Sequence, residues 1–273
     1  MEANHTATVI GIARHRILRD GKGITTLVGL KGCPLSCAYC LNREALRSHG
    51  TEMTGRQLYD AVKKDDLYFR ATEGGITFGG GEPLLNVGFI REFRALCPAS
   101  WRLNIETSLC VGRENVVKGA EVADTLIVDV KSLDPIVYRS YTGESATGMI
   151  ENLRYLAENP WRDKITVKVP FIPGYTRRGD VAVTLAAVRE LGFRSVTTLD
   201  YRPIKVPRPP RKPDAYGKKV CRVLRYVRNA VAESYGIACP DDDCKATVCT
   251  GTCPKCEAEL RSLTRRVRLI DNK

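Results

Sequence analysis

The chain has 273 residues, of which 43% are hydrophobic and 27% charged, and its formal net charge is +12. This composition excludes a disordered or fibrous protein, and the length suits one large α/β domain with an appendage. No run approaches the roughly 18 apolar residues of a membrane span, and the first ten residues lack the features of a signal peptide. We therefore expect a cytoplasmic monomer with no membrane partner.

Alternating apolar runs and helical patterns organise the first 205 residues. The expected strands, in chain order, lie at 25–30, 75–78, 101–105, 125–128, 165–169 and 196–199. The expected helices lie at 54–66, 87–96, 113–118, 147–158 and 181–191. Six βα units predict an α/β fold in which a parallel sheet curls into a partial, TIM-like (β/α)6 barrel.

Residues 206–273 are predicted to form a second region. A proline-rich connection precedes a basic helix at 216–235, and a cysteine-rich metal-binding tail follows. Basic side chains outnumber acidic ones strongly over 202–228, so this stretch is expected either to be a solvated surface or to face an acidic partner. Nucleic acid is possible there but is not favoured, because no nucleic-acid motif accompanies the charge.

Polar or glycine-rich loops follow all six expected strands. They read KGCPLSCAYC, GGGEP, ETS, DVK, PFIPG and DYRP. In a (β/α) barrel such loops crowd together at the carboxyl ends of the strands, where ligands bind. Residues spread over some 180 positions are therefore expected to converge on one site.

The first of these loops contains Cys33, Cys37 and Cys40 in C-x3-C-x2-C spacing. Clustered cysteines in a reducing compartment indicate metal ligands. Three thiolates on a four-iron cubane leave one iron free to bind a small molecule. Structural zinc takes four ligands, and no further cysteine or histidine lies close by in the sequence to complete such a site. The pattern therefore favours a [4Fe-4S] cluster with chemistry at its open iron.

This loop, CPLSCAYC, resembles the signature of the radical S-adenosylmethionine (SAM) superfamily, with Tyr39 as its aromatic residue and an expected cofactor contact. The segments DGKGITT, CLNRE, GGE and DVK make residues 20–205 most similar to activating enzymes of glycyl radical enzymes. The resemblance implies that the open iron chelates SAM, and that reduction of the cluster cleaves SAM to a 5'-deoxyadenosyl radical. It also implies a protein substrate, the glycyl radical enzyme, and flavodoxin or ferredoxin as the electron donor.

The same resemblance assigns roles to residues at the ends of the strands. Gly80, Gly81 and Glu82 match the motif that meets the SAM ammonium group, and Lys131 matches a SAM contact. The residues that match a monovalent cation site are Asp129, Glu106 and Thr107. Two further cofactor contacts are expected where basic residues replace those usual in the family, at Lys168 and Arg202.

A second cysteine set lies near the end of the chain, where CTGTCPKC repeats the spacing of the first. Its predicted ligands are Cys244, Cys249, Cys253 and Cys256, with Cys239 as a possible alternative. Either an auxiliary iron–sulfur cluster or a zinc ion would suit them. The remaining cysteines, Cys97, Cys110 and Cys221, are expected to be isolated, buried thiols.

The tail leaves two other functions open. A radical SAM maturase that modifies a peptide or protein would also carry a C-terminal auxiliary cluster. A protein of another class, which binds RNA through the basic stretch and zinc through the tail, would use no radical chemistry.

Overall fold

The computed structural model describes residues 5–201, 213–238 and 253–272. Arg202, an expected cofactor contact, lies outside the described residues, as do the candidate metal ligands Cys239, Cys244 and Cys249. Among the residues that are described, none of the helices is both long enough and apolar enough to cross a membrane.

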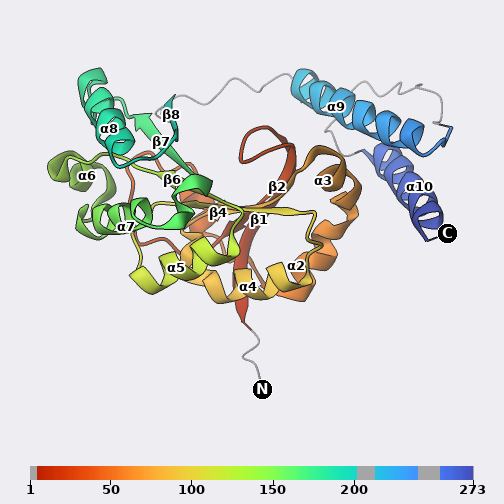
Figure 1. Ribbon diagram of the computed structural model, residues 1–273, viewed down its shortest axis with the longest axis horizontal. Coiled ribbons are helices and arrows are strands. Elements are labelled where there is room, and N and C mark those ends of the chain that lie inside the picture. Colours follow the sequence, from red (N-terminus) through yellow and green to blue (C-terminus); the bar gives the residue numbers. More distant parts are fainter. Residues whose placement is uncertain (1–4, 202–212, 239–252, 273) are drawn as a thin grey trace.

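An eight-stranded open sheet forms the centre of the molecule, in the order β3-β1-β2-β4-β5-β6-β7-β8 (Figure 1). Its six parallel strands are β2 (Ile24–Leu30), β4 (Gly75–Gly80), β5 (Arg102–Thr107), β6 (Thr125–Asp129), β7 (Ile165–Phe171) and β8 (Ser195–Asp200). All six predicted strands are thus confirmed, and the partial barrel with them.

Two antiparallel strands extend the sheet beyond β2 and were not predicted. They are β1 (Thr6–Ile17) and β3 (Thr51–Thr54). The charged segment of β1 resembles a surface loop in sequence, yet Arg14 and His15 are drawn inward by Asp65, which is fully buried. Contacts with a carboxylate about 50 positions away therefore stabilise a strand that hydrophobic periodicity alone does not predict.

Helices cover the sheet, and those predicted for the barrel are present. They are α2 (Gly55–Val62), α4 (Val87–Leu96), α5 (Arg113–Val122), α7 (Thr147–Ala157) and α8 (Arg178–Glu190). The helix expected at 54–66 is interrupted by a 3-10 turn at Lys63–Asp65 and continues as α3 (Asp66–Thr72). The basic helix is α9 (Pro213–Ser234).

Three helices were not predicted: α1 (Arg43–Arg47), α6 (Pro135–Thr142) and α10 (Pro254–Asp271). The sequence of α6 is rich in β-branched and aromatic residues, but its ends are well specified. Asp134 caps the backbone N–H groups of Ile136 and Val137, Pro135 is the first helical residue, and Gly143 ends the helix at a φ of +82°. The caps override the weak helical propensity.

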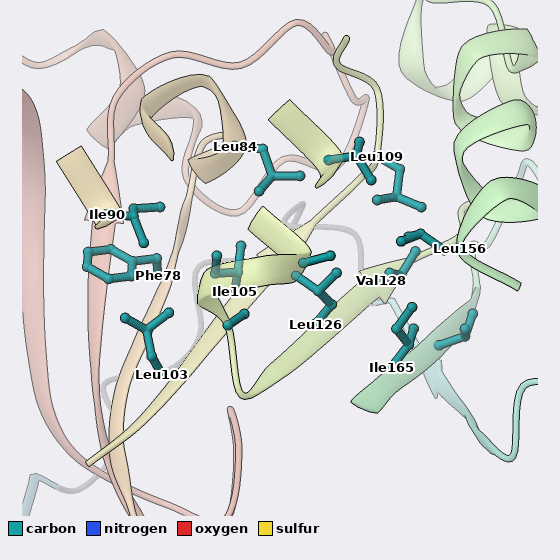
Figure 2. Packing of buried hydrophobic residues seen from close by; sticks show 14 of the residues in the cluster. Phe78, Leu84, Ile90, Leu103, Ile105, Leu109, Leu126, Val128, Leu156 and Ile165 are labelled. Atoms are coloured by element: carbon teal, nitrogen blue, oxygen red, sulfur yellow. The ribbon is translucent and has the colours of Figure 1, made fainter. Parts of the chain in front are cut away.

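The main core lies between the parallel strands and the helices that cover them. Figure 2 shows Phe78, Ile105 and Val128 of the sheet facing Ile90 of α4 and Leu156 of α7. Parallel strands covered in this way are apolar almost throughout, because few of their side chains reach water. The core fixes the carboxyl ends of the strands, where the loops of interest begin.

A second apolar cluster joins the C-terminal helices to the barrel. Leu224 of α9 and Leu260 of α10 are almost fully buried, together with Tyr68 of α3 and Ile24 at the start of β2. Figure 1 shows α9 and α10 beside α3, at the opposite end of the molecule from α6, α7 and α8. The described helices of the predicted second region therefore pack on the barrel itself.

Candidate active site

The three-cysteine loop leaves the carboxyl end of β2 and is held by the end of helix α6. The backbone N–H of Ser36 donates to the carbonyl of Thr142 at 2.8 Å, and that of Ala38 donates to the carbonyl of Tyr141 at 2.9 Å. These contacts join segments about 100 positions apart in the sequence. The cysteine loop is therefore supported by the helix that follows β6.

Tyr39 fixes the same loop to the far side of the sheet opening. Its hydroxyl donates to the carbonyl of Pro173, just beyond β7, at 3.0 Å. Its ring meets those of Tyr141 and Tyr175 edge to face, with centroids 6.0 and 5.6 Å apart. Tyr39 therefore positions the cysteine loop, and any contact with SAM stays a prediction.

The glycine motif after β4 lies directly against the cysteine loop. Gly81 N–H donates to Leu30 O at 2.9 Å, and Glu82 N–H donates to Gly32 O at 2.7 Å. A Cβ on Gly81 would come within 2.0 Å of the Gly32 oxygen, so only glycine fits. Gly80 has a φ of +91°, which also favours glycine.

The amide of Asn42, just after the cysteines, donates to the carbonyl of Gly80 at 2.8 Å and completes this brace. The sequence singled out the CLNRE segment only as a motif. In the structure its asparagine ties the cysteine loop to the glycine motif.

Glu82 is 1% exposed, and its carboxylate accepts four hydrogen bonds. Thr107 Oγ1 donates to it at 2.8 Å and Leu84 N–H at 3.2 Å, while Ser108 donates through its hydroxyl at 2.6 Å and its N–H at 2.8 Å. Burial raises the pKa of Glu82, although these donors act in the opposite direction. The carboxylate thus locks the glycine motif to the end of β5, a role for Ser108 that the sequence did not reveal.

The cysteines themselves suit a cluster site by their chemistry. Cys33 is exposed, whereas Cys37 and Cys40 are half-buried, and all three thiols are free. Burial raises the pKa of Cys37 to about 11, while the ammonium of Lys131 acts to lower it. Metal binding releases the thiol proton, and a nearby cation stabilises the resulting thiolate. The donor set and its charge environment therefore fit a [4Fe-4S] cluster with one iron open.

Asp129 and Lys131 meet at the carboxyl end of β6, where they form a triangle with Tyr201. Lys131 donates to Asp129 and, at 2.5 Å, to the hydroxyl of Tyr201, which in turn donates to Asp129 at 2.6 Å. Burial lowers the pKa of Lys131, but the charges of Asp129 and Cys37 outweigh it and raise the pKa overall. Sequence reasoning did not identify Tyr201 as a site residue. Its position just after β8, at the carboxyl end of a strand, was the signal that could have indicated it.

One oxygen of this triangle remains available to a ligand. Asp129 Oδ1 is buried and has no hydrogen-bond partner. An unpaired buried acceptor costs about 1–3 kcal/mol unless a ligand satisfies it. The end of β6 is therefore suited to bind a donor group or a cation.

Glu106 and Lys168 form a separate pair across the sheet, with Nζ and Oε1 3.0 Å apart. Thr107, expected beside Glu106 in a cation site, is instead bonded to Glu82. The carboxylate of Glu106 is thus already balanced by a lysine ammonium. The monovalent cation stays a prediction, as does a contact between Lys168 and SAM.

The described part of the tail places two predicted ligands at the start of α10. Cys253 lies at the N-cap position of α10 and is half-buried, and Cys256 is 6% exposed. Cys221 is buried, as predicted, but it is not isolated, because its sulfur lies 3.9 Å from that of Cys256. Arg228, counted above with the basic surface, is 4% exposed and paired with Glu259.

Comparison with known proteins decides the family. The model of the radical SAM superfamily matches residues 27–188, more than half of the chain. The chain belongs to the radical SAM superfamily. The RNA-binding alternative, which lacked radical chemistry, is therefore not supported, and a [4Fe-4S] cluster with bound SAM is inherent to this family.

Several curated relatives are activating enzymes. The pyruvate formate-lyase-activating enzyme of Listeria monocytogenes is 32% identical over 150 residues, which cover 51% of this chain and 59% of that enzyme. The pyruvate formate-lyase 1-activating enzyme of Escherichia coli is 30% identical over 178 residues, covering 63% and 72%. The indoleacetate decarboxylase activating enzyme of Tractidigestivibacter scatoligenes is 28% identical over 182 residues, covering 66% and 57%. The chain thus spans less than two thirds of the Listeria relative.

Solved radical SAM structures share the fold. SuiB from Streptococcus suis bound to S-adenosylmethionine is 13% identical with a TM-score of 0.51, covering 75% of this chain and 45% of that one. The structure of anSMEcpe with bound AdoMet is 14% identical, also with a TM-score of 0.51, and covers 75% and 58%. At such low identity the likeness shows the partial barrel alone.

Proposed function

We propose that this radical SAM enzyme activates a glycyl radical enzyme. In the proposed reaction, one electron cleaves SAM to methionine and a 5'-deoxyadenosyl radical. The radical takes a hydrogen atom from the Cα of a glycine in the partner protein, which yields 5'-deoxyadenosine and a glycyl radical. The observation that carries the proposal is the hydrogen-bonded triangle of Asp129, Lys131 and Tyr201 beside the cysteine loop. It occurs in a chain whose relatives are activating enzymes.

Cys33, Cys37 and Cys40 would hold the cluster, which when bound supplies the electron for SAM cleavage. The loop keeps its position because the end of α6, Pro173 and the glycine motif brace it from three sides. A one-electron donor, flavodoxin or ferredoxin, would reduce the cluster. No general acid or base is required for hydrogen-atom abstraction, so the residues need only bind, orient and exclude water.

The remaining residues would bind SAM. The carbonyl of Gly80 already accepts a hydrogen bond from Asn42, and its second lone pair can accept one from an ammonium group. Lys131, with its charge maintained by Asp129, can donate to a carboxylate. Asp129 Oδ1 offers the unpaired acceptor described above. These donors and acceptors are complementary to the amino-acid end of SAM.

The decisive experiment incubates the reduced protein and SAM with a purified glycyl radical enzyme from the same organism. We expect a glycyl radical signal in electron paramagnetic resonance, with one 5'-deoxyadenosine formed per radical. A partner labelled with α-deuterated glycine should pass deuterium into the 5'-deoxyadenosine. The matched control is the partner with its radical-site glycine changed to alanine, which should give neither signal.

A second candidate, a peptide-modifying maturase, is favoured by the C-terminal cysteine set. If 5'-deoxyadenosine forms only with a short precursor peptide and no glycyl radical appears, this candidate replaces the activase. Both share the same cluster and SAM chemistry, so the test separates them by substrate alone.

A further inference from the structure

Three thiols gather where α9 meets the start of α10, far along the chain from the first cluster. The sulfur atoms of Cys221 and Cys256 are 3.9 Å apart, and both residues are 6% exposed. Cys253, the N-cap residue just before α10, packs against this pair. Spacing motifs cannot reveal Cys221 as part of this group, because it lies 35 positions before Cys256.

We propose that Cys221, Cys253 and Cys256 are ligands of one tetrahedral zinc ion. Two thiolates on a tetrahedral ion with metal–sulfur bonds of about 2.3 Å have their sulfur atoms about 3.8 Å apart, close to the spacing of Cys221 and Cys256. Cys253 and Cys256 also form the short C-x2-C pair that zinc sites use. In a cubane cluster each thiolate binds a different iron, which holds the sulfur atoms further apart.

The surroundings of the pair suit bound thiolates. An Nη of Arg228 lies 3.9 Å from the sulfur of Cys256, and the guanidinium is 4% exposed. The same group donates to Tyr68 at 2.7 Å and to Glu259 at 2.8 Å, so its orientation is fixed. Three thiolates on a divalent ion carry a net negative charge, which a buried guanidinium offsets.

The three thiols do not yet surround a common point. Within the described ranges no three Cys, His, Asp or Glu side chains form a group that could hold a metal ion. Cys253, the most exposed of the three, would turn toward the pair on binding. Structural zinc takes four ligands. A fourth ligand from among Cys239, Cys244 and Cys249 stays a sequence prediction, since they lie outside the described residues.

A zinc ion here would fasten the C-terminal helices to each other. Cys221 belongs to α9 and Cys256 to α10, which lie side by side in Figure 1 and pack together. Arg228 then links the same site to Tyr68 of α3. This structural role does not depend on the proposed activase function, so either proposal can fail without the other.

The test measures metal in the full-length protein, purified with Cys33, Cys37 and Cys40 changed to alanine so that only the tail metal remains. We expect one zinc per chain by mass spectrometry, and a loss of nearly all of it in Cys221→Ser. Cys97→Ser, which changes a thiol outside this group, is the matched control and should keep its zinc. Cobalt in place of zinc should give thiolate-to-cobalt absorption that weakens in Cys221→Ser.

Three outcomes would overturn the proposal: full zinc content in Cys221→Ser, iron and sulfide in place of zinc, or a Cys221–Cys256 disulfide in the unreduced protein. Because Cys221→Ser alters a buried position, circular dichroism should accompany it. Cys221→His keeps a zinc ligand at this position and should retain more zinc than Cys221→Ser. Equal loss in both variants would count against a ligand role.

Discussion

The two cysteine sets have the same C-x3-C-x2-C spacing but opposite surroundings. In the first, the thiols lie on a loop at the open end of the sheet, and Cys33 is exposed. In the second, Cys256 is buried at the start of a helix, against Cys221 and Arg228 of another helix. Spacing fixes which thiols can share a metal. Their surroundings decide whether a substrate can reach it: among the described thiols Cys33 is exposed, whereas Cys221 and Cys256 are buried.

The largest expected effect is the loss of SAM cleavage when the first cysteine site alone is disrupted. Cys37→Ala removes one of three thiolates, and we expect SAM cleavage to fall to the uncatalysed background. The assay is 5'-deoxyadenosine formed after anaerobic reconstitution and reduction. Cys97→Ala should retain activity, because Cys97 lies at the end of α4, away from the cysteine loop. Undiminished cleavage in Cys37→Ala would remove the cysteine loop as the cluster site.

The next largest effect concerns how the second region is fastened to the barrel. Asp65 is fully buried, and Arg14 joins it to Glu257 of α10. Removing one partner of a buried ion pair costs about 3–5 kcal/mol, so Asp65→Asn should lower the free energy of unfolding by about 3 kcal/mol. Denaturant unfolding measures this difference, and the exposed Asp60→Asn is the control, expected to leave stability unchanged.

The same pair predicts a pH dependence. Burial raises the pKa of Asp65, but Arg14 and His15 outweigh it and hold the pKa below the ordinary 3.8. A carboxylate with a depressed folded pKa contributes stability above its unfolded pKa and loses it as the pH falls through the folded pKa. The gap between the wild-type protein and Asp65→Asn should therefore shrink below pH 3.8. A gap that widens there would contradict the ion pair.

The barrel was predictable because its signals are local. Runs such as 75–80 are apolar on both faces, which predicts a buried strand. Even for α6, which was not predicted, Asp134, Pro135 and Gly143 are local signals that mark the ends of the helix. The glycine motif and the DVK segment could be placed at one mouth, since each directly follows a strand. Topology alone brings them together.

What the sequence could not provide depends on contacts between distant positions. Tyr201 reaches Asp129 across 72 positions, and Arg14 reaches Asp65 across 51. The contact of Glu82 with SAM stays a prediction, but the sequence did not reveal that its carboxylate is hydrogen-bonded to Ser108 and Thr107, 26 and 25 positions away. Charge and motif identify such residues as interesting, but only packing determines their partners.

A smaller effect tests whether Lys131 contributes to SAM binding at the first site. Lys131→Met removes the ammonium at the end of β6, and a hydrogen bond to a charged group is worth about 1.5–3 kcal/mol. SAM should therefore bind roughly 10- to 100-fold more weakly to the reconstituted protein. Equilibrium binding measures the change, with the exposed Lys22→Met as control. Equal affinity in wild type and Lys131→Met would remove Lys131 from the SAM site.

The smallest effect concerns the contact between the second cysteine set and the barrel, which runs through Arg228 of α9 and Tyr68 of α3. Tyr68→Phe removes the hydroxyl that accepts a hydrogen bond from Arg228 at 2.7 Å but keeps the buried ring. The free energy of unfolding should fall by only about 1–2 kcal/mol, because the guanidinium keeps Glu259 as a partner. Since Arg228 belongs to α9, hydrogen exchange should quicken in α9 and stay unchanged in β5. Exchange that quickens equally in both would mean that the hydroxyl stabilises the whole barrel, and that the second region is not fastened separately.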